Sequence, residues 1–414
     1  MSRFPVPWRW PAWVWLGLIA VIFTIRFPIH FIFYPPYLMD LDVYRAVALR
    51  LVEGGGAHLY DPTSTDVMMF KYAPCWAVAW VPLAWLPAQT AAIAWSALTV
   101  VWFVLSCWLT QRLCARAGLN PPAWLPVAVA LLLSRPLTAE FLNGQVDVLW
   151  GALVLGALAL RLANRSWLSA LLLALAIALK LPALIVWLDL VARRQWRDAG
   201  RVVAAFTAVN AAACALLYPA APWQLAIRWW SVLWSSGVSR AFEIGNQSLL
   251  ALAGRFLSAD PYRLNVLGLP PRGVLLVTLA ALGLLFLLVL AGRRRRSDST
   301  SRDVFDGALL TLLMVLGSPT VWIATYSACI LPVAVGVSCA IGQPRATWRH
   351  PLPALLASVL VLLSFMTHSG FWHAIGVRYV RGESYVFLVL MILPWLGLAL
   401  FTYLWQQRRV LLRA

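Results

Sequence analysis

Long apolar runs dominate this sequence and leave few folds open to it. They recur from 13–33 to 385–405, and most are bounded by arginine, proline or tryptophan. A helix needs about 20 apolar residues to cross a bilayer, and a chain that repeats such runs has far more apolar surface than one water-soluble core can bury. The composition agrees, with 62% hydrophobic residues and 24 tryptophans. We therefore predict an all-α, polytopic membrane protein.

The predicted path has about twelve transmembrane helices, with both termini in the cytoplasm. The first run is longer than the core of a signal peptide and no small-residue cleavage site follows it, so we expect it to be retained. Every connection placed in the cytoplasm carries arginine, as the positive-inside rule requires. The predicted spans are 13–33, 89–111, 123–134, 146–162, 167–178, 181–192, 202–218, 274–291, 304–317, 326–341, 352–365 and 385–405.

Several of these spans are shorter than a bilayer is thick. The runs 167–178 and 181–192 are joined at Lys180 and Pro182, which predicts either a thinned bilayer or helices broken around a cavity. The segment 73–86 is also short and contains prolines. We place it on the outer surface or let it re-enter, since a crossing there would reverse the charge bias of every later loop.

A net charge of +18 can indicate nucleic-acid binding, but the distribution of the arginines argues against it. They lie in short groups between apolar runs, such as Arg293–Arg296, which topology anchoring or contact with anionic lipid explains better. The six cysteines have no C-x-x-C spacing, so we predict neither a disulfide framework nor a zinc site. No glycine-rich phosphate loop precedes a helix, which argues against a nucleotide-sugar or ATP substrate.

Carboxylates are scarce in this chain, and their clustering needs a reason. Five of the 15 acidic residues fall between 39 and 74, within a predicted extracytoplasmic loop at 34–88. A second long outer loop is predicted at 219–272. Most polar residues that are not arginine anchors thus gather on one side, and ionisable groups near membrane depth are usually paired or functional. This pattern predicts an active site at the outer interface.

Asp40 and Asp42 are the central candidates in that loop. In an extended segment they point to opposite sides, and only one of them would face a common cavity. If a helix starts near Asp42, that residue could cap it instead. We prefer Asp40 in the site with Asp42 as a cap or supporting group, over the alternative in which both only cap or solvate a loop. Two carboxylates are a weak metal signal, so we rank a base role above metal binding and predict no cofactor.

Three further polar groups interrupt the apolar pattern. Asn143, Gln145 and Asp147 could hydrogen-bond sugar hydroxyls or simply cap a helix. Lys180 suits a phosphate, although a lysine there could also snorkel to the interface. Asn246 and Gln247 belong to a second amide-rich outer loop, beside a tryptophan-rich segment at 223–234 that we expect to lie in the membrane interface.

These blocks resemble a known family. Asp40-Leu41-Asp42-Val43-Tyr44, Leu59-Tyr60-Asp61 and Tyr72-Ala73-Pro74-x(7)-Pro82-Leu83 resemble the opening of the polyprenyl-phosphate-mannose-dependent mannosyltransferases, glycosyltransferase family 87. The later blocks are similar to those of the family and follow in the same order. They are Asn143-Gly144-Gln145, Ala178-Leu179-Lys180-x-Pro182, Gly245-Asn246-Gln247-Ser248-Leu249 and Ser318-Pro319-x-x-Trp322.

The resemblance implies a single membrane domain over 1–414 with a GT-C fold and juxtamembrane helices in its first outer loop. It also implies catalysis by Asp40 and inverting transfer, without a required metal, of a sugar from a polyprenyl-phosphate donor. We expect mannose as the sugar, a glycolipid or glycan as acceptor, and membrane lipids but no nucleic acid as partners. The site would face outward from the cell inner membrane. The predicted substrate-binding residues are Asp42, Tyr44, Arg45, Lys71, Tyr72, Asn143, Gln145, Asp147, Lys180, Asn246, Gln247 and Trp322.

The expected chemistry needs one base and one cationic clamp. A neutral hydroxyl is a poor nucleophile, so a carboxylate takes its proton as it attacks the anomeric carbon. Lys180, together with Arg45 or Arg255, would offset the growing charge of the leaving phosphate. The chain departs from the family pattern after Trp322, where Ile323-Ala324-Thr325 replaces a frequent histidine or acid. The alternatives are another polyprenyl-phosphate sugar, such as arabinose or glucose, and a transporter or flippase for lipid-linked sugars, which should expose polar residues on both sides of a central path.

Overall fold

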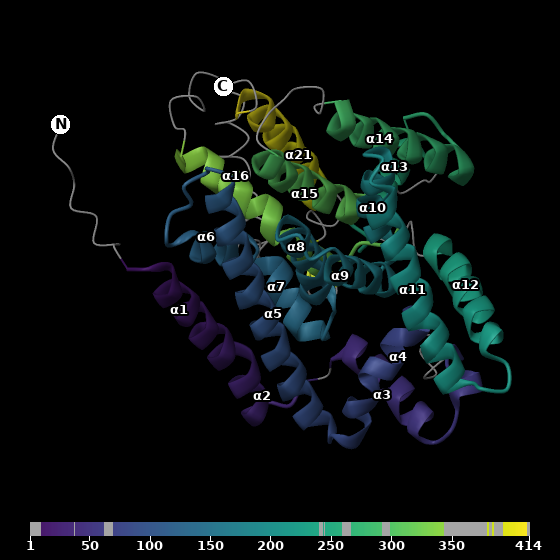
Figure 1. Cartoon of the computed structure of the whole chain (residues 1–414). Coiled ribbons are helices and arrows are strands. Elements are labelled where there is room, and N and C mark those ends of the chain that lie inside the picture. The colour runs from purple at the N-terminus through teal and green to yellow at the C-terminus, as the bar shows by residue number, and fades with distance from the viewer. Residues whose placement is uncertain are drawn as a thin grey trace, which may run out of the picture.

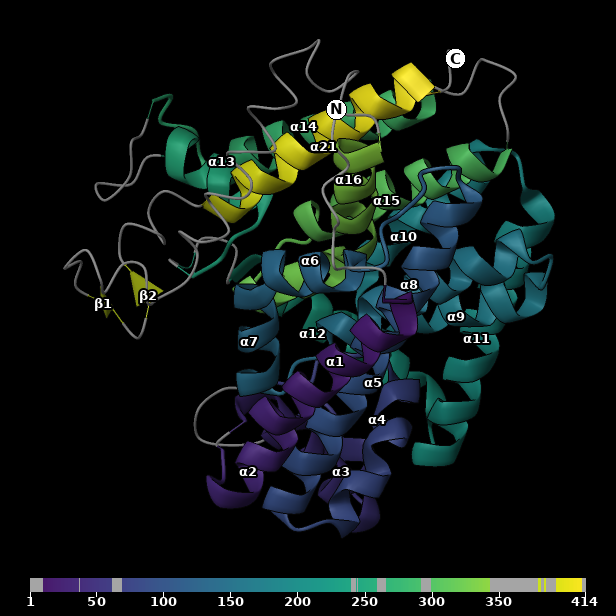
Figure 2. The ribbon, with the colours of Figure 1, turned by 90° about the vertical axis from the view of Figure 1, so that its left-hand side faces the viewer.

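We describe a computed structural model of the chain. The residues that it places are 10–36, 38–61, 69–239, 243, 245–258, 266–291, 299–342, 379–380, 383–384 and 392–411. The predicted span 352–365 and the Arg293–Arg296 group lie outside these described residues. The described part is helical (Figures 1 and 2), apart from a small antiparallel hairpin of β1 (Tyr379–Val380) and β2 (Glu383–Ser384).

The helices follow the apolar runs of the sequence. They are α1 (Ala12–Thr24), α2 (His30–Phe33), α3 (Met39–Val52), α4 (Pro74–Trp80), α5 (Ala88–Arg116), α6 (Leu125–Leu132), α7 (Ser134–Asn143), α8 (Asp147–Leu162), α9 (Ser166–Leu179), α10 (Leu184–Ala192), α11 (Trp196–Leu217), α12 (Pro222–Ser239), α13 (Leu249–Leu257), α14 (Pro271–Ala291), α15 (Ser299–Leu316), α16 (Ile330–Gly342) and α21 (Ile392–Leu411). The tighter or wider turns are η1 (Ile25–Ile29), η2 (Gly56–His58), η3 (Val81–Trp85), η4 (Leu181–Ala183) and η5 (Ile323–Cys329).

Within the described residues, five helical stretches are long and apolar enough to cross a membrane. They are Ala12–Phe33, Ala88–Arg116, Trp196–Leu217, Pro271–Ala291 and Ile323–Gly342, and the bent pair α6 and α7 would add a sixth. This finding supports the predicted multi-pass membrane protein. It does not confirm about twelve crossings, because α9 and the η4–α10 stretch are apolar helices too short to pass the same test.

Prolines account for the irregular places in these helices. Pro136 lies in the first turn of α7, where its ring has no N–H to donate and clashes with the carbonyl four residues earlier. The predicted span 123–134 therefore ends early, and α6 and α7 meet at an angle of 68°. Pro28 lies inside the wide turn η1 of the first span, which continues through it from Ala12 to Phe33.

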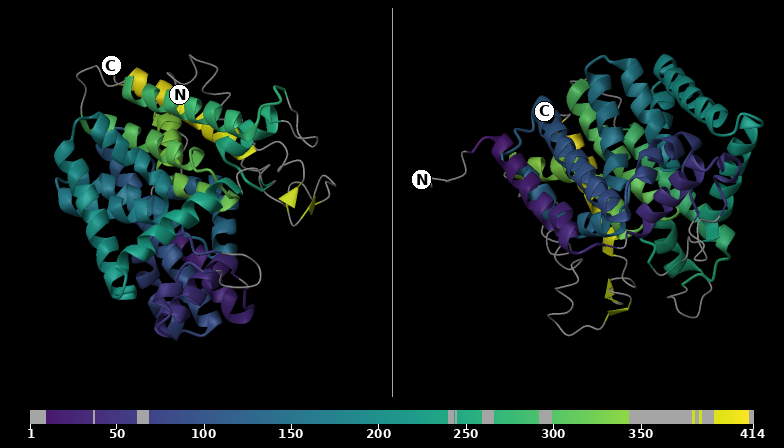
Figure 3. Two further views of the ribbon diagram at one scale, coloured as in Figure 1. Left: turned by 90° about the vertical axis from the view of Figure 1, so that its right-hand side faces the viewer. Right: turned by 90° about the horizontal axis from the view of Figure 1, so that it is seen from below.

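The helices pack around a centre formed by α8 and α9. Helix α8 packs against α5 and α9, and α11 covers the other side of α9 and also contacts α12 (Figures 1 and 3). Small residues permit close approach, since a Cβ added to Gly151 of α8 would lie 2.9 Å from the Cα of Ala328 in η5. In Figures 1 and 2, α14 and α21 lie at one end of the molecule and α3 at the other.

The proline-containing segment 73–86 forms α4 and η3, neither of which is long enough to span a bilayer. Both pack against α3, and α4 also packs against α11. This geometry agrees with the expectation that the segment does not cross the membrane.

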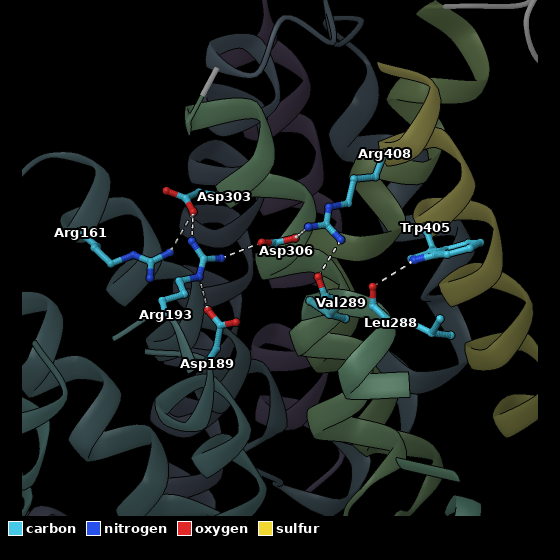
Figure 4. Close-up of polar contacts among 9 residues, drawn as sticks. All are labelled: Arg161, Asp189, Arg193, Leu288, Val289, Asp303, Asp306, Trp405 and Arg408. Carbon is cyan, nitrogen blue, oxygen red and sulfur yellow. Dashed lines mark hydrogen bonds and ion pairs between the residues drawn. The ribbon is translucent and has the colours of Figure 1, made fainter. Parts of the chain in front are cut away.

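Three arginines that the positive-inside rule places in the cytoplasm form one ion cluster with three aspartates (Figure 4). The guanidinium of Arg193 lies 2.7 Å from Asp189 and 2.7 Å from Asp306, and it also donates to Asp303. Arg408 of α21 lies 2.7 Å from the other oxygen of Asp306, and Arg161 of α8 lies 3.7 Å from Asp303. Three arginines and three aspartates thus neutralise one another and tie α8, α10, α15 and α21 together.

Asp306 is the link in this cluster whose loss should be most damaging. Its side chain is fully buried and bridges Arg193 and Arg408, so Asp306→Asn leaves three arginines against two aspartates in the cluster. We expect a loss of about 3 kcal/mol in stability, visible as a lower Tm in detergent. The control is Asp198→Asn, which breaks a half-exposed pair with Arg201 and should cost under about 1 kcal/mol. An equal Tm for both variants would show that the cluster is not stabilising.

Candidate active site

A cavity of about 430 Å³ collects most of the predicted site residues. It lies between the start of α3, the segment 69–72, the turn from α7 to α8, the break after α9, helix α12 and the loop 318–322. Seven of the predicted residues line it: Asp40, Tyr44, Lys71, Tyr72, Gln145, Lys180 and Trp322.

Asp40 provides the only carboxylate among the described residues that line the cavity. It lies in the first turn of α3, where the helix dipole favours a negative charge. Loss of contact with bulk water nevertheless raises the pKa of Asp40 to about 6, although Lys180 and a hydrogen bond from Gln145 oppose this and Asp147 adds to it. The carboxylate is therefore ionised at neutral pH and more basic than an ordinary aspartate.

Two tyrosines form the wall next to Asp40. Tyr44 lies one helical turn further along α3, and its hydroxyl hydrogen-bonds that of Tyr72 at 2.9 Å. Burial raises the pKa of both phenols well above 10, so both stay neutral. The Tyr72 carbonyl accepts a hydrogen bond from the Tyr60 hydroxyl at 3.0 Å, and the Ala73 N–H donates to Ala178 at the end of α9. These hydrogen bonds join α3, the segment 69–73 and the end of α9 at the site.

Lys180 stands at the break between α9 and η4. Its backbone is extended (φ −146°, ψ 118°), and Pro182 prevents the helix from continuing through it. The ammonium donates to the Asp147 carboxylate at 2.5 Å and lies 5.7 Å from the Trp150 ring. Asp147, the first residue of α8, is fully buried and does not line the cavity. It therefore holds the lysine in place from behind the cavity wall.

Glu140 lies in the same interior and was given no role from the sequence. Its carboxyl group accepts hydrogen bonds from the Val148 N–H at 2.9 Å and from the Ser327 hydroxyl at 3.1 Å. It thus satisfies the first turn of α8 and ties it to η5. The sequence signal that could have indicated its role was its position between a predicted span and the Asn143-Gly144-Gln145 block.

The three residues of the Asn143-Gly144-Gln145 block have different roles. The Gln145 side chain lines the cavity and bonds Asp40, whereas the Asn143 amide donates to Ala139 of its own helix at 2.8 Å. Asn143 therefore bonds back to its own helix, and the capping position of α7 belongs to Gly144. Gly144 ends α7 in the left-handed region (φ +68°), which other residues rarely adopt.

Asn246 does not line the cavity, and its side chain bonds the loops behind the cavity wall. It is fully buried, and its carbonyl oxygen accepts hydrogen bonds from the N–H groups of Ser248 (3.0 Å) and Val321 (2.9 Å). Its amide donates to the Pro319 carbonyl at 2.8 Å. Gln247, also buried, donates its N–H to the Val321 carbonyl. Together they fix the loop that places Trp322 in the cavity.

Three charged candidates lie away from the cavity. Asp42 is half-buried and follows the helix start, while Leu38 occupies the capping position, so neither the cap nor the substrate role is seen. Burial raises its pKa, and Arg45 opposes that rise. The Arg45 guanidinium donates to the Leu86 carbonyl at 2.9 Å. Arg255 belongs to α13 and is not among the residues of the cavity wall.

Trp229 is a cavity residue that the sequence reading missed. Its indole N–H donates to the Lys71 carbonyl at 3.0 Å, so α12 positions the 69–72 segment. The tryptophans at 223, 230 and 234 share one exposed helix face, as an interfacial segment should. Trp229 lies on the opposite face with buried Leu225 and Val232, and this 3.6-residue periodicity was the missed signal.

The described residues include no group of three or more His, Cys, Asp or Glu side chains placed to hold a metal ion. The six cysteines are all free, and each lies in or beside an apolar helix. The polar groups in the cavity wall include the carboxylate, the two lysines, the amide and the aromatic hydroxyls already described, together with Ser318 and Thr320. Such a set suits a polyhydroxylated ligand that also carries a negative charge.

The fold and cavity together define a multi-pass membrane protein with an enzyme-like site. Over residues 70–319 the chain matches the model of Glycosyltransferase family 87, and it belongs to that family. The resemblance found in the sequence blocks is thereby confirmed, and the protein is a glycosyltransferase.

Three curated relatives are similar to the chain. The polyprenol-phosphate-mannose-dependent alpha-(1-2)-phosphatidylinositol mannoside mannosyltransferase of Mycolicibacterium smegmatis is 28% identical over 387 residues, 88% of this chain and 84% of that protein. The Mycobacterium tuberculosis protein of the same name is 31% identical over 188 residues, 41% and 43% of the two chains. A pentamannoside mannosyltransferase of Mycobacterium tuberculosis is 33% identical over 176 residues, 41% and 40% of the two chains.

Proposed function

We propose that this glycosyltransferase moves mannose from a polyprenyl-phosphate donor to a glycolipid acceptor, with inversion, at the extracytoplasmic face of the cell inner membrane. One observation carries the proposal: Asp40 and Lys180, a base and a phosphate-binding cation, line the same cavity. The relatives' names supply the donor and acceptor classes, since they specify polyprenol-phosphate mannose and phosphatidylinositol mannosides.

Asp40 acts as the general base. Its raised pKa brings it closer to neutrality, where a base both remains ionised and accepts a proton readily. The Gln145 side chain lies beside Asp40 in the cavity wall and stabilises the ionised carboxylate. Asp40 therefore takes the proton of the acceptor hydroxyl as that oxygen bonds to the anomeric carbon.

Lys180 and Lys71 stabilise the departing phosphate. Both line the cavity, and Lys180 is anchored by Asp147 at 2.5 Å, so its ammonium is positioned before the substrate arrives. As the bond between the sugar and the phosphate breaks, negative charge grows on the phosphate oxygens, and the ammonium groups offset it. The neutral Tyr44 and Tyr72 hydroxyls remain available to orient the sugar.

The presence of one lining carboxylate favours inversion. A retaining transfer through a covalent intermediate uses two carboxyl groups about 5 Å apart, one of them as nucleophile. Among the described lining residues Asp40 stands alone, and buried Asp147 is engaged behind Lys180. A single displacement therefore accounts for the groups present.

The charge distribution supports an outward-facing site. Exposed Arg112 and Arg116 lie near the end of α5, whose other end packs through Trp95 against Tyr44 of the active site. Basic residues mark the cytoplasmic side of membrane proteins. The Asp40 end then faces outward.

Transfer assays with defined donors test this function. The purified enzyme is incubated with polyprenyl-phosphate mannose, glucose or arabinose and a membrane-lipid extract, with EDTA present, and labelled sugar is followed into new lipids. We expect transfer from the mannose donor alone. Transfer from another donor would reassign the sugar, and loss of activity in EDTA that Mg²⁺ restores would contradict the metal-free chemistry. Movement of intact donor across vesicles without transfer would indicate a flippase.

The pH dependence of sugar transfer should report the pKa of Asp40, which Lys180 lowers. In the wild type, kcat/KM should fall as pH drops through about 6, because a protonated base cannot accept the acceptor proton. Lys180→Met removes the largest influence that lowers the Asp40 pKa, so the acid limb should move to higher pH. Lys71→Met should move it in the same direction by less, since Lys71 contributes less. An acid limb at the same pH in all three proteins would remove Asp40 as its source.

A further inference from the structure

A second cavity lies between α5 and α8, and it shares no lining residue with the active site. Its volume is about 480 Å³, and Leu172 of α9 closes one side. The walls are apolar except at one end, where Arg112 and Arg116 of α5 contribute to the lining. We call this cavity, with its arginine end, the α5–α8 groove.

Small residues make the floor of the groove. Ala152, Gly156 and Ala159 follow at helical spacing on one face of α8, opposite the larger Trp102 and Leu105 of α5. From Trp102 to Arg116 the groove follows fourteen residues of α5, or about 21 Å at the helical rise of 1.5 Å per residue. That length exceeds the roughly 15 Å of hydrocarbon in one leaflet. The groove therefore has the dimensions of an acyl chain lying along a helix.

The arginine end has the features of a head-group site. Arg112 and Arg116 are exposed and one turn apart, and among the described residues no carboxylate pairs with either of them. The Arg112 guanidinium lies 4.0 Å from the centre of the Trp108 ring, which holds it beside the groove. Tryptophan and arginine are both typical of the boundary between hydrocarbon and head groups. A guanidinium offers several donors to the oxygens of a phosphate.

We infer that the α5–α8 groove binds an anionic phospholipid of the surrounding bilayer. One acyl chain lies over the alanine and glycine floor, and the phosphate is held by Arg112 and Arg116. Two unpaired positive charges favour a head group with net negative charge over a zwitterionic one. The apolar walls favour a lipid over a soluble anion.

The groove belongs to the opposite leaflet from the proposed chemistry. Trp95, near the start of α5, packs against Tyr44 of the active site with ring centres 5.9 Å apart. Arg112 follows seventeen residues later, about 26 Å along the helix. A donor or acceptor seated in the active site cannot also place its phosphate at Arg112, so the bound lipid is a separate ligand.

Native mass spectrometry of the full chain in detergent tests the inference. Dioleoyl phosphatidylglycerol and dioleoyl phosphatidylcholine are titrated against the wild type, the double variant R112Q/R116Q and the matched control R165Q/R197Q. Arg165 and Arg197 are exposed and do not line the groove. We expect tight binding of one phosphatidylglycerol, weakened about 30-fold by R112Q/R116Q, which corresponds to about 1 kcal/mol for each arginine. The control should bind as the wild type does.

A third variant tests whether lipid binding needs the apolar floor of the groove as well as the two arginines. Ala152→Leu with Ala159→Leu fills the floor and keeps both arginines, so it too should lose the lipid while its Tm in detergent shows that it is folded. Undiminished binding by either groove variant would overturn the inference, as would equal binding of phosphatidylcholine. Displacement of the lipid by polyprenyl phosphate at equal concentration would also overturn it, by assigning the groove to the donor's chain.

Discussion

Asp40→Asn should lower kcat for sugar transfer by about 10³-fold or more, because general-base catalysis contributes about 10² to 10⁴ and an amide cannot accept the proton. The amide is nearly isosteric with the carboxyl group, so donor binding should change little. Transfer of labelled sugar in single-turnover experiments measures the chemical step directly. The matched control is Asp42→Asn, in the same turn of α3 but outside the cavity, which should stay within about tenfold of the wild type.

The same substitution should make the folded protein more stable at neutral pH. Burial raises the pKa of Asp40 to about 6 in the folded state, above its ordinary value of 3.8. Its favourable contribution is therefore complete below pH 3.8 and is lost as the pH rises through about 6. At pH 7.5 the Tm of Asp40→Asn should exceed that of the wild type by about 2 °C, and the gain should shrink toward pH 5. Equal transfer by both proteins would remove Asp40 from the mechanism whatever the Tm.

Gly144→Ala should damage both stability and catalysis. Gly144 has a positive φ of 68°, and an added Cβ would lie 2.8 Å from the Cβ of Leu41 and 3.2 Å from that of Leu38. These leucines flank Asp40 at the start of α3, so the clash moves the catalytic turn. We expect a loss of about 2–4 kcal/mol from backbone strain and overpacking. A fall in kcat of about 10²-fold should accompany it, as expected for a misplacement near 1 Å.

Gly118→Ala provides the matched control for that prediction. Gly118 follows α5 with a similar φ of 72°, but nothing lies within 4 Å of an added Cβ. It should cost about 1 kcal/mol through backbone strain alone and leave kcat unchanged. If Gly144→Ala behaved in the same way, the contact between the α7–α8 turn and α3 would not be what positions Asp40.

The positions of the helices could be read from the sequence, whereas their number of crossings could not. Apolar runs fix where helices form, and nearly every described run is helical. Whether a short helix such as α9 or α10 crosses depends on its tilt and on the bilayer around it, which hydropathy does not record. The bend at Pro136 shows how one residue divides a run that composition treats as continuous.

The site could be predicted at the level of blocks, but only partly at the level of side chains. The spacing of Lys180 and Pro182 indicated a helix broken at a cavity, and both residues line one. Asn246 was as good a candidate as Gln145 on residue type alone. Only the fold shows that Asn246 binds the backbone of a neighbouring loop, which lies more than seventy residues away in the chain. Trp229 was missed because its neighbours fit an interfacial role.

The ion cluster also has a consequence for the order in which the protein is made. Asp306 emerges from the ribosome about a hundred residues before Arg408, because synthesis runs from the N-terminus. Until α21 docks, the cluster holds three aspartates against Arg161 and Arg193. A nascent chain that stops before α21 therefore lacks the arginine that pairs with one carboxylate oxygen of Asp306, and the docking of α21 is the biogenesis step that supplies it.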